Sequence, residues 1–281
     1  MGMLKRILVG ISGAPGTEAK IAWTLELAKR HAASVTVLSM VNRDQLRNVG
    51  PVPLGATYYA ERLGQDRIEH SLAAAEEAVE AFSAACSAAA VPLRVMREKG
   101  DPFEQLVKAW RYADLCLLGI RGWFDHGLIP EPENALLRLV AQGMRPLLAV
   151  PNTVHTVRRI LIAYNGSLES AKTMKQFIQA PLWQGVETYV VCMGAPKTGE
   201  DAGVLLADAV DYARDHGCEL HISNPPCVAA PWQALLAHAA EVKADLIVLG
   251  SSYRKVLLSQ RFGRNAINLI QTATLPLFLS H

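Results

Sequence analysis

The chain has 281 residues, which is long for one compact domain and sufficient for two. Apolar residues make up 51% of it, enough for sizeable hydrophobic cores, and the formal net charge is +2. So small a surplus of positive charge argues against a nucleic-acid-binding protein, which needs a strongly basic surface.

Short apolar runs alternate with helical patterns along the first half, which is typical of β-α-β units and a parallel sheet. The predicted strands are Arg6–Ile11, Ser34–Val41, Leu93–Glu98, Leu115–Gly119 and Leu147–Val150. The predicted helices are Thr17–His31, Asp66–Ala90, Pro102–Tyr112 and Asn134–Gly143. The strands are continuously apolar rather than alternating, so we expect helices on both faces of the sheet.

The second half shows the same order of elements. Its predicted strands are Arg159–Tyr164, Glu187–Cys192, Glu219–Ser223, Leu246–Gly250 and Leu277–Leu279. Between the halves lies "PNTVHT", a polar stretch whose proline ends one strand before the next begins. We therefore predict two domains, residues 1–152 and residues 156–281.

The two halves are copies of one another. "KRILVGISG" matches "RRILIAYNG", "YADLCLLG" matches "KADLIVLG", and "ENALLRLVAQGMRPLLAVP" matches "RNAINLIQTATLPLFLSH". The second copy is shorter, and the difference falls largely within "NRDQLRNVGPVPLGATYYAERLG" of the first. We interpret this insertion as a surface loop leading into a helix. The alternative is that Leu46, Val49, Tyr58 and Tyr59 within it shape a ligand pocket.

These repeated motifs resemble those of tandem universal stress proteins, over nearly the whole chain. The resemblance implies two Rossmann-like (adenine nucleotide alpha hydrolase-like) α/β domains, each with a five-stranded parallel sheet covered by helices on both faces. It also implies a role in stress response, and a nucleotide motif of Gly, two residues, Gly, nine residues, Gly, then Ser or Thr. Ligands of open α/β sheets settle at the carboxyl ends of the strands, and glycine there allows backbone to approach phosphate.

The second half keeps this motif with substitutions. Gly250 and Gly263 match the first and third glycines, while Tyr253 replaces the second and Arg264 replaces the Ser or Thr. Hydroxyl groups and cations surround these positions, and the segment holds no acidic residue. The predicted nucleotide-binding residues are Asn165, Gly250, Ser251, Ser252, Tyr253, Arg254, Arg261, Gly263, Arg264 and Asn265.

Asn165 follows the first strand of this half and stands where the family has an aspartate near the nucleoside. Its amide can still hydrogen-bond a ribose or an adenine edge, without the charge. Ser167 is interpreted either as a cap of the following helix or as a ligand contact.

The first half departs further from the motif. Gly119 and Gly122 match, but the third glycine is Pro132, and prolines remove backbone N–H donors. Three acidic residues in the same loop oppose a phosphate, namely Asp125, Glu131 and Glu133. We therefore predict a degenerate first copy. The segment "VGISGAPGTE" is only a weak match to the pyrophosphatase loop of ATP-using enzymes, and it is more simply a turn into a helix.

Three functions are compared. The first is a stress-response regulatory protein that binds ATP or AMP in the second domain only. The second is a tandem scaffold without nucleotide that acts through partner proteins or another small, partly apolar ligand. The third is an enzyme, which we disfavour because no Ser-His-Asp order, carboxylate pair or zinc pattern stands out. Slow ATP hydrolysis would be the weakest enzymatic activity of this kind. Whether Mg²⁺ is bound is left open, because the second-half loop offers no carboxylate.

Cysteines and histidines predict no metal site. An odd number of cysteines, without a Cys-x-x-Cys pair, indicates buried thiols in a reducing compartment: Cys86, Cys116, Cys192, Cys218 and Cys227. The segment "HGCELH" groups His216, Cys218 and His221, but the usual zinc spacings are missing. The N-terminal apolar run is too short for a signal peptide or a membrane span. We expect a cytoplasmic protein with no membrane partner.

The last strand of each copy, "PLLAVP" and "PLFLSH", is apolar and would be exposed in an isolated copy. Resemblance to the family, whose members commonly pair through this strand, implies that the two halves pair with each other inside one chain. Whether two chains then form a homodimer is left open.

Overall fold

The computed structural model describes most of the chain. The described residues are 4–12, 16–39, 41, 46, 57–98, 101–120, 136–137, 139–141, 146–223, 225, 229–251, 253–256 and 259–281, without the side chains of 57, 102, 253–256 and 259–262.

The first half alternates strands and helices as predicted. Its elements are β1 (Arg6–Ile11), α1 (Thr17–His31), β2 (Ser34–Ser39), α3 (Thr57–Ala88), β3 (Leu93–Arg97), α4 (Pro102–Trp110), β4 (Leu115–Gly119) and β5 (Leu147–Val150). β1, α1, β4 and β5 have the predicted bounds, because each apolar run is closed by polar or turn-forming residues. α3 begins earlier than the predicted Asp66, so the end of the insertion is helical. Tyr58 and Tyr59 are exposed on that helix and Leu46 is buried, whereas Val49 lies outside the described residues.

The second half repeats the pattern and adds a hairpin. Its elements are β6 (Arg159–Ala163), α6 (Leu168–Gln179), β7 (Glu187–Val191), α7 (Ala202–Asp215), β8 (His221–Ser223), α8 (Pro231–Glu241), β9 (Leu246–Gly250), β10 (Tyr253–Val256), β11 (Ser259–Phe262), α9 (Arg264–Thr272) and β12 (Leu277–Ser280). β8 is shorter than the predicted strand, and the β10–β11 hairpin was not predicted.

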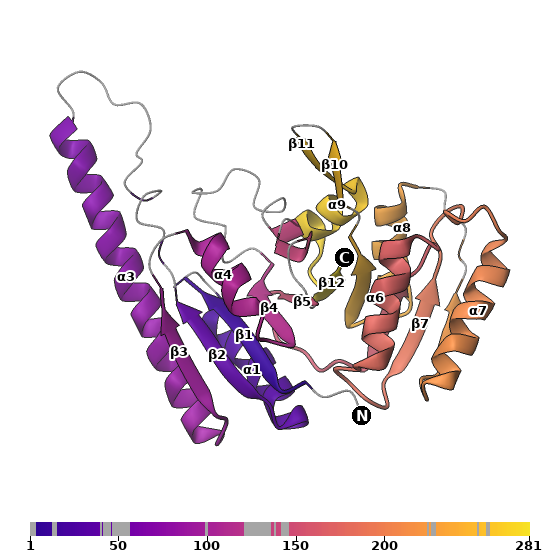
Figure 1. Ribbon diagram of the computed structural model, residues 1–281, viewed down its shortest axis with the longest axis horizontal. Helices are drawn as coiled ribbons and strands as arrows, with labels where there is room; N and C mark the ends of the chain where they lie inside the picture. The colour runs from indigo at the N-terminus through magenta and orange to yellow at the C-terminus, as the bar shows by residue number, and fades with distance from the viewer. Residues whose placement is uncertain are drawn as a thin grey trace.

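Among the described residues, all strands except those of the hairpin join one ten-stranded sheet in the order β3-β2-β1-β4-β5-β12-β9-β6-β7-β8 (Figure 1). Each half contributes five strands that are parallel to one another. The predicted fold class, α/β with a parallel sheet and helices on both faces in each half, is confirmed.

The two halves meet at β5 and β12, the one antiparallel pairing within the described sheet. Leu277 pairs with Ala149, Phe278 with Leu148, and Leu279 with Leu147. The expected pairing of the two halves through their last strands is therefore present in the structure. These residues are fully or almost fully buried, because helices cover both faces of the junction.

Two hydrophobic cores lie on the two faces of the sheet. One packs α1, α3, α6 and α7 on one face, and the other packs α4, α8 and α9 on the opposite face. Neighbouring residues of a strand point into different cores: in β1, Ile7 and Val9 belong to the first core and Leu8 to the second. This explains why the strands are continuously apolar.

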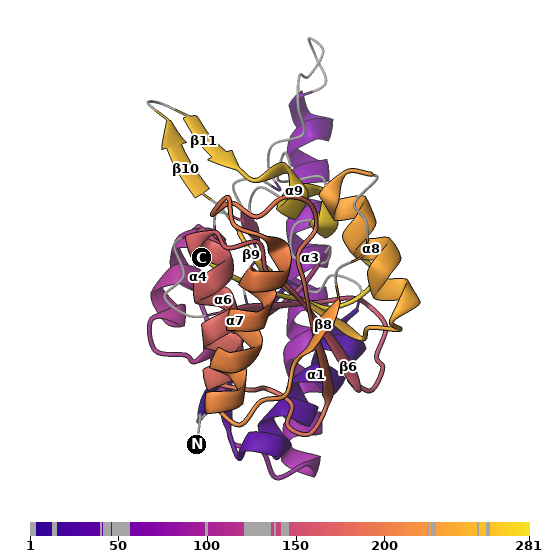
Figure 2. The same cartoon turned by 90° about the vertical axis from the view of Figure 1, so that its right-hand side faces the viewer.

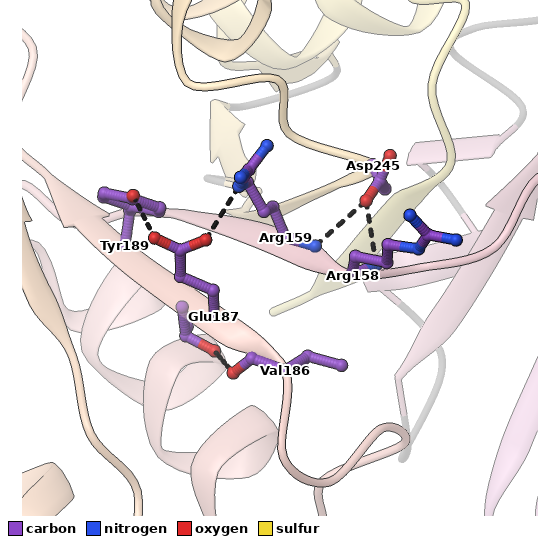
Figure 3. A network of polar contacts seen from close by, with 7 residues as sticks. Arg158, Arg159, Val186, Glu187, Tyr189 and Asp245 are labelled. Atoms are coloured by element: carbon purple, nitrogen blue, oxygen red, sulfur yellow. Dashed lines mark hydrogen bonds and ion pairs between the residues drawn. The ribbon is translucent and has the colours of Figure 1, made fainter.

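The repeat extends to the polar contacts that begin the first strand of each copy. The Asp114 carboxylate accepts from the backbone N–H groups of Lys5 and Arg6, at 2.9 and 3.0 Å. Asp245, at the corresponding place of the second copy, accepts from Arg158 and Arg159 at 2.8 and 2.9 Å (Figure 3). Each aspartate thus fixes the start of its first strand beside the fourth strand.

The connection between the halves is anchored to both of them. The Trp23 indole N–H donates to the Thr153 carbonyl at 3.2 Å, and the Trp23 ring meets His155 edge-on at 5.3 Å. His155 Nε2 lies 2.9 Å from the Asp245 carbonyl oxygen. The connecting segment therefore packs on α1 of the first half and on the start of β9. Within the described residues, no helix is both long and apolar enough to cross a membrane.

Candidate crevice at the carboxyl ends of β6 and β9

The predicted site lies where β6, β9 and β12 end side by side. Ala163 of β6 pairs with Leu249 of β9, and Gly250 pairs with Ser280 of β12. The chain leaves β6 into the N-terminus of α6, and it leaves β9 towards the hairpin and α9 (Figure 2). Such an edge is where ligands of open α/β sheets bind.

Asn165 is held against the N-terminus of α6. Its Oδ1 accepts from the Ser167 backbone N–H at 3.1 Å and from the Ser170 hydroxyl at 3.0 Å. Its backbone carbonyl accepts from the Lys197 N–H at 2.8 Å. The side-chain oxygen is therefore used inside the protein, and only the amide N–H groups are left as donors towards a ligand.

Ser167 caps α6. Its hydroxyl accepts from the Ser170 backbone N–H at 3.2 Å, and its backbone is extended, as expected of an N-cap residue. Of the two interpretations of Ser167, the structure supports the structural one.

Gly250 brings β9 into backbone contact with α6. A Cβ atom at this position would lie 2.7 Å from the backbone of Glu169 and of Ser170. Real Cβ atoms essentially never come this close to backbone atoms. Glycine at this position is therefore explained by the close packing of a strand against a helix, independently of any ligand.

Ser251 is buried and its polar groups have partners within the protein. Its N–H donates to the Ser280 carbonyl at 2.9 Å, its hydroxyl donates to the same oxygen at 3.4 Å, and its own carbonyl lies 2.8 Å from Nδ1 of His281. Ser251 therefore ties β9 to the C-terminus of the chain. Ser252 lies outside the described residues.

The predicted phosphate loop is in large part a β-hairpin. Tyr253 pairs with Phe262 and Arg254 with Arg261 across antiparallel strands, and the hairpin projects from the sheet (Figure 2). A hairpin was not among the elements predicted for this segment. Tyr253, Val256 and Phe262 favour strands, and the tyrosine stands where the motif has its second glycine.

The hairpin leads directly into α9. Gly263 occupies the N-cap position, which makes no side-chain hydrogen bond to the helix. Arg264 and Asn265 follow in the first turn and are exposed. α9 therefore presents free N–H groups and a positive dipole end next to an arginine, an arrangement that favours an anion.

The first-half crevice is described only in part. Gly119 ends β4 as predicted, and Gly16 begins α1 with a φ of +88°. The glycine, prolines and acidic residues on which the predicted degeneracy depends lie outside the described residues, namely Gly122, Asp125, Pro130, Glu131, Pro132 and Glu133.

A cavity of about 930 Å³ lies elsewhere, at the amino ends of β7 and β8, and His216, Cys218 and His221 are among its lining residues. The described part of the chain holds no group of three side chains placed to bind a metal ion. Burial, together with the nearby Glu219, raises the pKa of the Cys218 thiol. Cys86, Cys116 and Cys192 are buried cysteines, and Cys227 lies outside the described residues.

Comparisons with known proteins identify the family of the first half and the fold of the whole chain. Residues 3–140 match the model of the Universal stress protein family. The fold of the whole chain is similar to that of a universal stress protein from Archaeoglobus fulgidus, with 18% identity, 98% of this chain and 97% of that chain covered, and a TM-score of 0.69. It is also similar to a protein of unknown function from Pseudomonas aeruginosa PAO1, with 15% identity, coverage of 99% and 92%, and a TM-score of 0.58. No curated protein gave a significant match.

The first half of the chain thus belongs to the universal stress protein family, by the match of residues 3–140. The second half has the same strand order, and two universal-stress-protein-like halves are compatible with a tandem arrangement.

Proposed function

We propose that the protein is a stress-response regulatory protein that binds an adenine nucleotide, ATP or AMP, in its second half only. The observation that carries this proposal is the register of the hairpin, which pairs Arg254 directly with Arg261. Paired residues of an antiparallel ladder lie on the same face of it, and like charges at such positions destabilise the pairing. A bound polyanion relieves that repulsion.

The N-terminus of α9 supports the same ligand. It begins immediately after the hairpin, its N-cap Gly263 makes no side-chain hydrogen bond, and Arg264 is exposed in its first turn. A phosphate chain between the hairpin and α9 meets three arginines and free backbone N–H groups. Charge-assisted hydrogen bonds of this kind are among the strongest that a protein makes to phosphate.

We expect the nucleoside end of the nucleotide at Asn165. The side-chain Oδ1 of Asn165 already accepts two hydrogen bonds at the start of α6, so its amide N–H groups would donate to the nucleoside. The hairpin strands carry no carboxylate to hold Mg²⁺. We therefore propose binding rather than hydrolysis of the nucleotide, with Mg²⁺ entering only as a companion of the phosphates.

Restriction to the second half follows from the composition of the two loops. The first-half loop carries Asp125, Glu131 and Glu133 and two prolines, whereas the second-half segment carries arginines and a lysine. We also propose the two halves as domains of residues 1–152 and 156–281. The segment of residues 151–158 between β5 and β6, which forms neither helix nor strand, supports this division.

Calorimetric titration with ATP and with AMP tests the proposal. We expect each of the variants Arg254→Gln and Arg261→Gln to weaken binding by roughly 10-fold or more, since hydrogen bonds to charged groups contribute about 1.5–3 kcal/mol. Arg214→Gln is the matched control, because Arg214 is an exposed arginine paired with Asp211 on α7. Its affinity should be unchanged.

Absence of binding at millimolar nucleotide would contradict the proposal and favour a scaffold that acts through partner proteins. Mass spectrometry of small molecules retained through native purification is the complementary measurement, because it presumes no ligand class. Retention of an apolar metabolite instead of a nucleotide would favour the other-ligand alternative.

A further inference from the structure

A serine, a histidine and a glutamate meet at the outer edge of the second half. Ser223 ends β8, and His238 and Glu241 lie on α8, which packs beside that strand (Figure 2). The Ser223 hydroxyl lies 2.6 Å from His238 Nε2, and His238 Nδ1 lies 3.0 Å from the Glu241 carboxylate. Nucleophile, base and orienting acid thus form one continuous chain of hydrogen bonds.

The chemistry of the two hydrogen-bond partners favours one tautomer of His238. An ionised carboxylate only accepts hydrogen bonds, so Nδ1 of His238 must be the N–H that donates to Glu241. In the neutral imidazole, Nε2 then carries the lone pair and accepts from the Ser223 hydroxyl. In this tautomer the unprotonated Nε2 of His238 accepts the hydrogen bond from the Ser223 hydroxyl and can act as a general base towards it. Nucleophilic catalysis by serine requires this arrangement.

His238 is held in place by burial, whereas Ser223 is accessible to solvent. His238 is only 6% exposed, and its helix neighbours Leu235 and Ala239 belong to the core beneath α8. Ser223 is half-buried on the terminal strand of the sheet, next to Ile222, which is 50% exposed. The Glu241 side chain is 74% exposed, so it orients the imidazole from the solvent side.

We propose that Ser223 is a nucleophile for acyl transfer, with His238 as its general base and Glu241 as a positioning residue, and that the site reacts with small, activated carboxylic esters. Ser223 Oγ forms a bond to the ester carbonyl carbon while its proton passes to His238 Nε2. The C–O bond to the leaving alcohol breaks, and the alcohol takes that proton. Water, deprotonated by His238, then releases the carboxylic acid and restores the Ser223 hydroxyl.

This site is separate from the proposed nucleotide crevice. β8 is separated from β6 by β7 in the sheet order, and none of its three residues belongs to the predicted nucleotide-binding set. Loss of either activity would therefore leave the other unchanged.

The test uses the intact protein with a fluorophosphonate probe, which labels activated serines, and with p-nitrophenyl acetate. We expect labelling at Ser223, located by peptide mass spectrometry, and its absence in Ser223→Ala. General-base assistance contributes about 10²–10⁴-fold, so His238→Asn should slow labelling at least about 100-fold. Glu241→Gln should slow it by about 10-fold, because a glutamine can present its NH₂ to Nδ1 and reverse the tautomer.

Glu241→Gln also separates chemistry from stability, since a contact made by a glutamate whose side chain is 74% exposed contributes little to folding. Its thermal unfolding should match that of the unmodified protein while its labelling rate falls. Ser83→Ala is the matched serine control, because Ser83 is half-buried and donates to the Val79 carbonyl at 2.8 Å instead of to an imidazole. The proposal would be overturned if Ser223 were labelled no faster than Ser83, or if labelling of Ser223 were equally fast in His238→Asn, in Glu241→Gln and in the unmodified protein. Either outcome would leave only a structural link between β8 and α8.

Discussion

Trp183 of the second half donates its indole N–H to the Glu26 carboxylate of the first half at 2.9 Å. Trp183 is buried, and its ring meets that of Trp23 edge-on at 6.2 Å. Glu26 also accepts from Arg30 in the next turn of α1 at 3.3 Å. Together with the contact of 2.9 Å between His31 Nε2 and the Leu182 carbonyl, this pair joins α1 to the second half away from the β5–β12 junction.

Trp183→Phe should lower the free energy of unfolding by about 1–2 kcal/mol more than a matched change elsewhere, because it removes a hydrogen bond to a charged group. The matched change is Trp110→Phe, since the Trp110 indole N–H is buried without a partner among the described residues. Urea denaturation of both variants measures the difference. Equal losses would show that the bond to Glu26 contributes nothing.

Leu148 and Leu277 are fully buried on the two strands of the junction. The double variant Leu148→Lys/Leu277→Lys should be strongly destabilised, because two unpaired ammonium groups would be buried in an apolar core. We expect a clearly lower midpoint of thermal unfolding, or no folded protein. Leu168→Lys with Val204→Lys, two exposed apolar positions of the second half, is the control. An unchanged midpoint in the junction variant would refute the pairing of the two halves.

Gly250→Ala should destabilise the protein by about 1–3 kcal/mol, the usual cost of overpacking, since its methyl group would overlap the backbone of α6. Gly203→Ala is the comparison, because there the added Cβ meets only the end of the Asp201 side chain. Chemical denaturation of the two variants checks this. If Gly250→Ala were as stable as Gly203→Ala, close packing would not explain the glycine.

Lys20 is only 2% exposed, and its amine has no hydrogen-bond partner in the described part of the chain. Burial lowers the pKa of Lys20 from 10.5 to about 8. Between pH of about 8 and 10.5, the Lys20 amine is protonated in the unfolded chain and neutral in the folded protein. The free energy of unfolding therefore rises as the pH increases through this range. Below a pH of about 8, the Lys20 amine is charged in both the folded and the unfolded state. The full free-energy cost of burying the charged amine, about 3 kcal/mol, is then present.

Lys20→Met should therefore stabilise the protein at pH 7, and its advantage should shrink as the pH rises from about 8 to 10.5. Denaturation curves across that range measure the effect. Lys29→Met, an exposed lysine on the same helix, should show no such trend. An advantage of Lys20→Met that is constant with pH would mean that the amine is not the source of the penalty.

The strands and the fold could be predicted from continuous apolar runs, because a strand that helices cover on both faces is apolar at nearly every position. The hairpin was missed because the resemblance places a glycine-containing loop here, although Tyr253, Val256 and Phe262 are residue types that favour strands. Gly250 matches the motif and Ser251 was a predicted binding residue, yet the structure explains Gly250 by close packing and Ser251 by hydrogen bonds within the protein, neither of which the sequence reveals. The cluster of Ser223, His238 and Glu241 was missed because it needs β8 and α8 placed side by side. The only local signal was a His and a Glu spaced three residues apart on a helix.

The antiparallel β5–β12 junction also bears on how this molecule can evolve. When two identical chains associate through such a junction, every substitution occurs twice, and both ligand sites change together. Here the partners are consecutive parts of one polypeptide, so a mutation alters only one of them. One copy is free to gain prolines and acidic residues while the other keeps its arginines, with the shared framework unaffected.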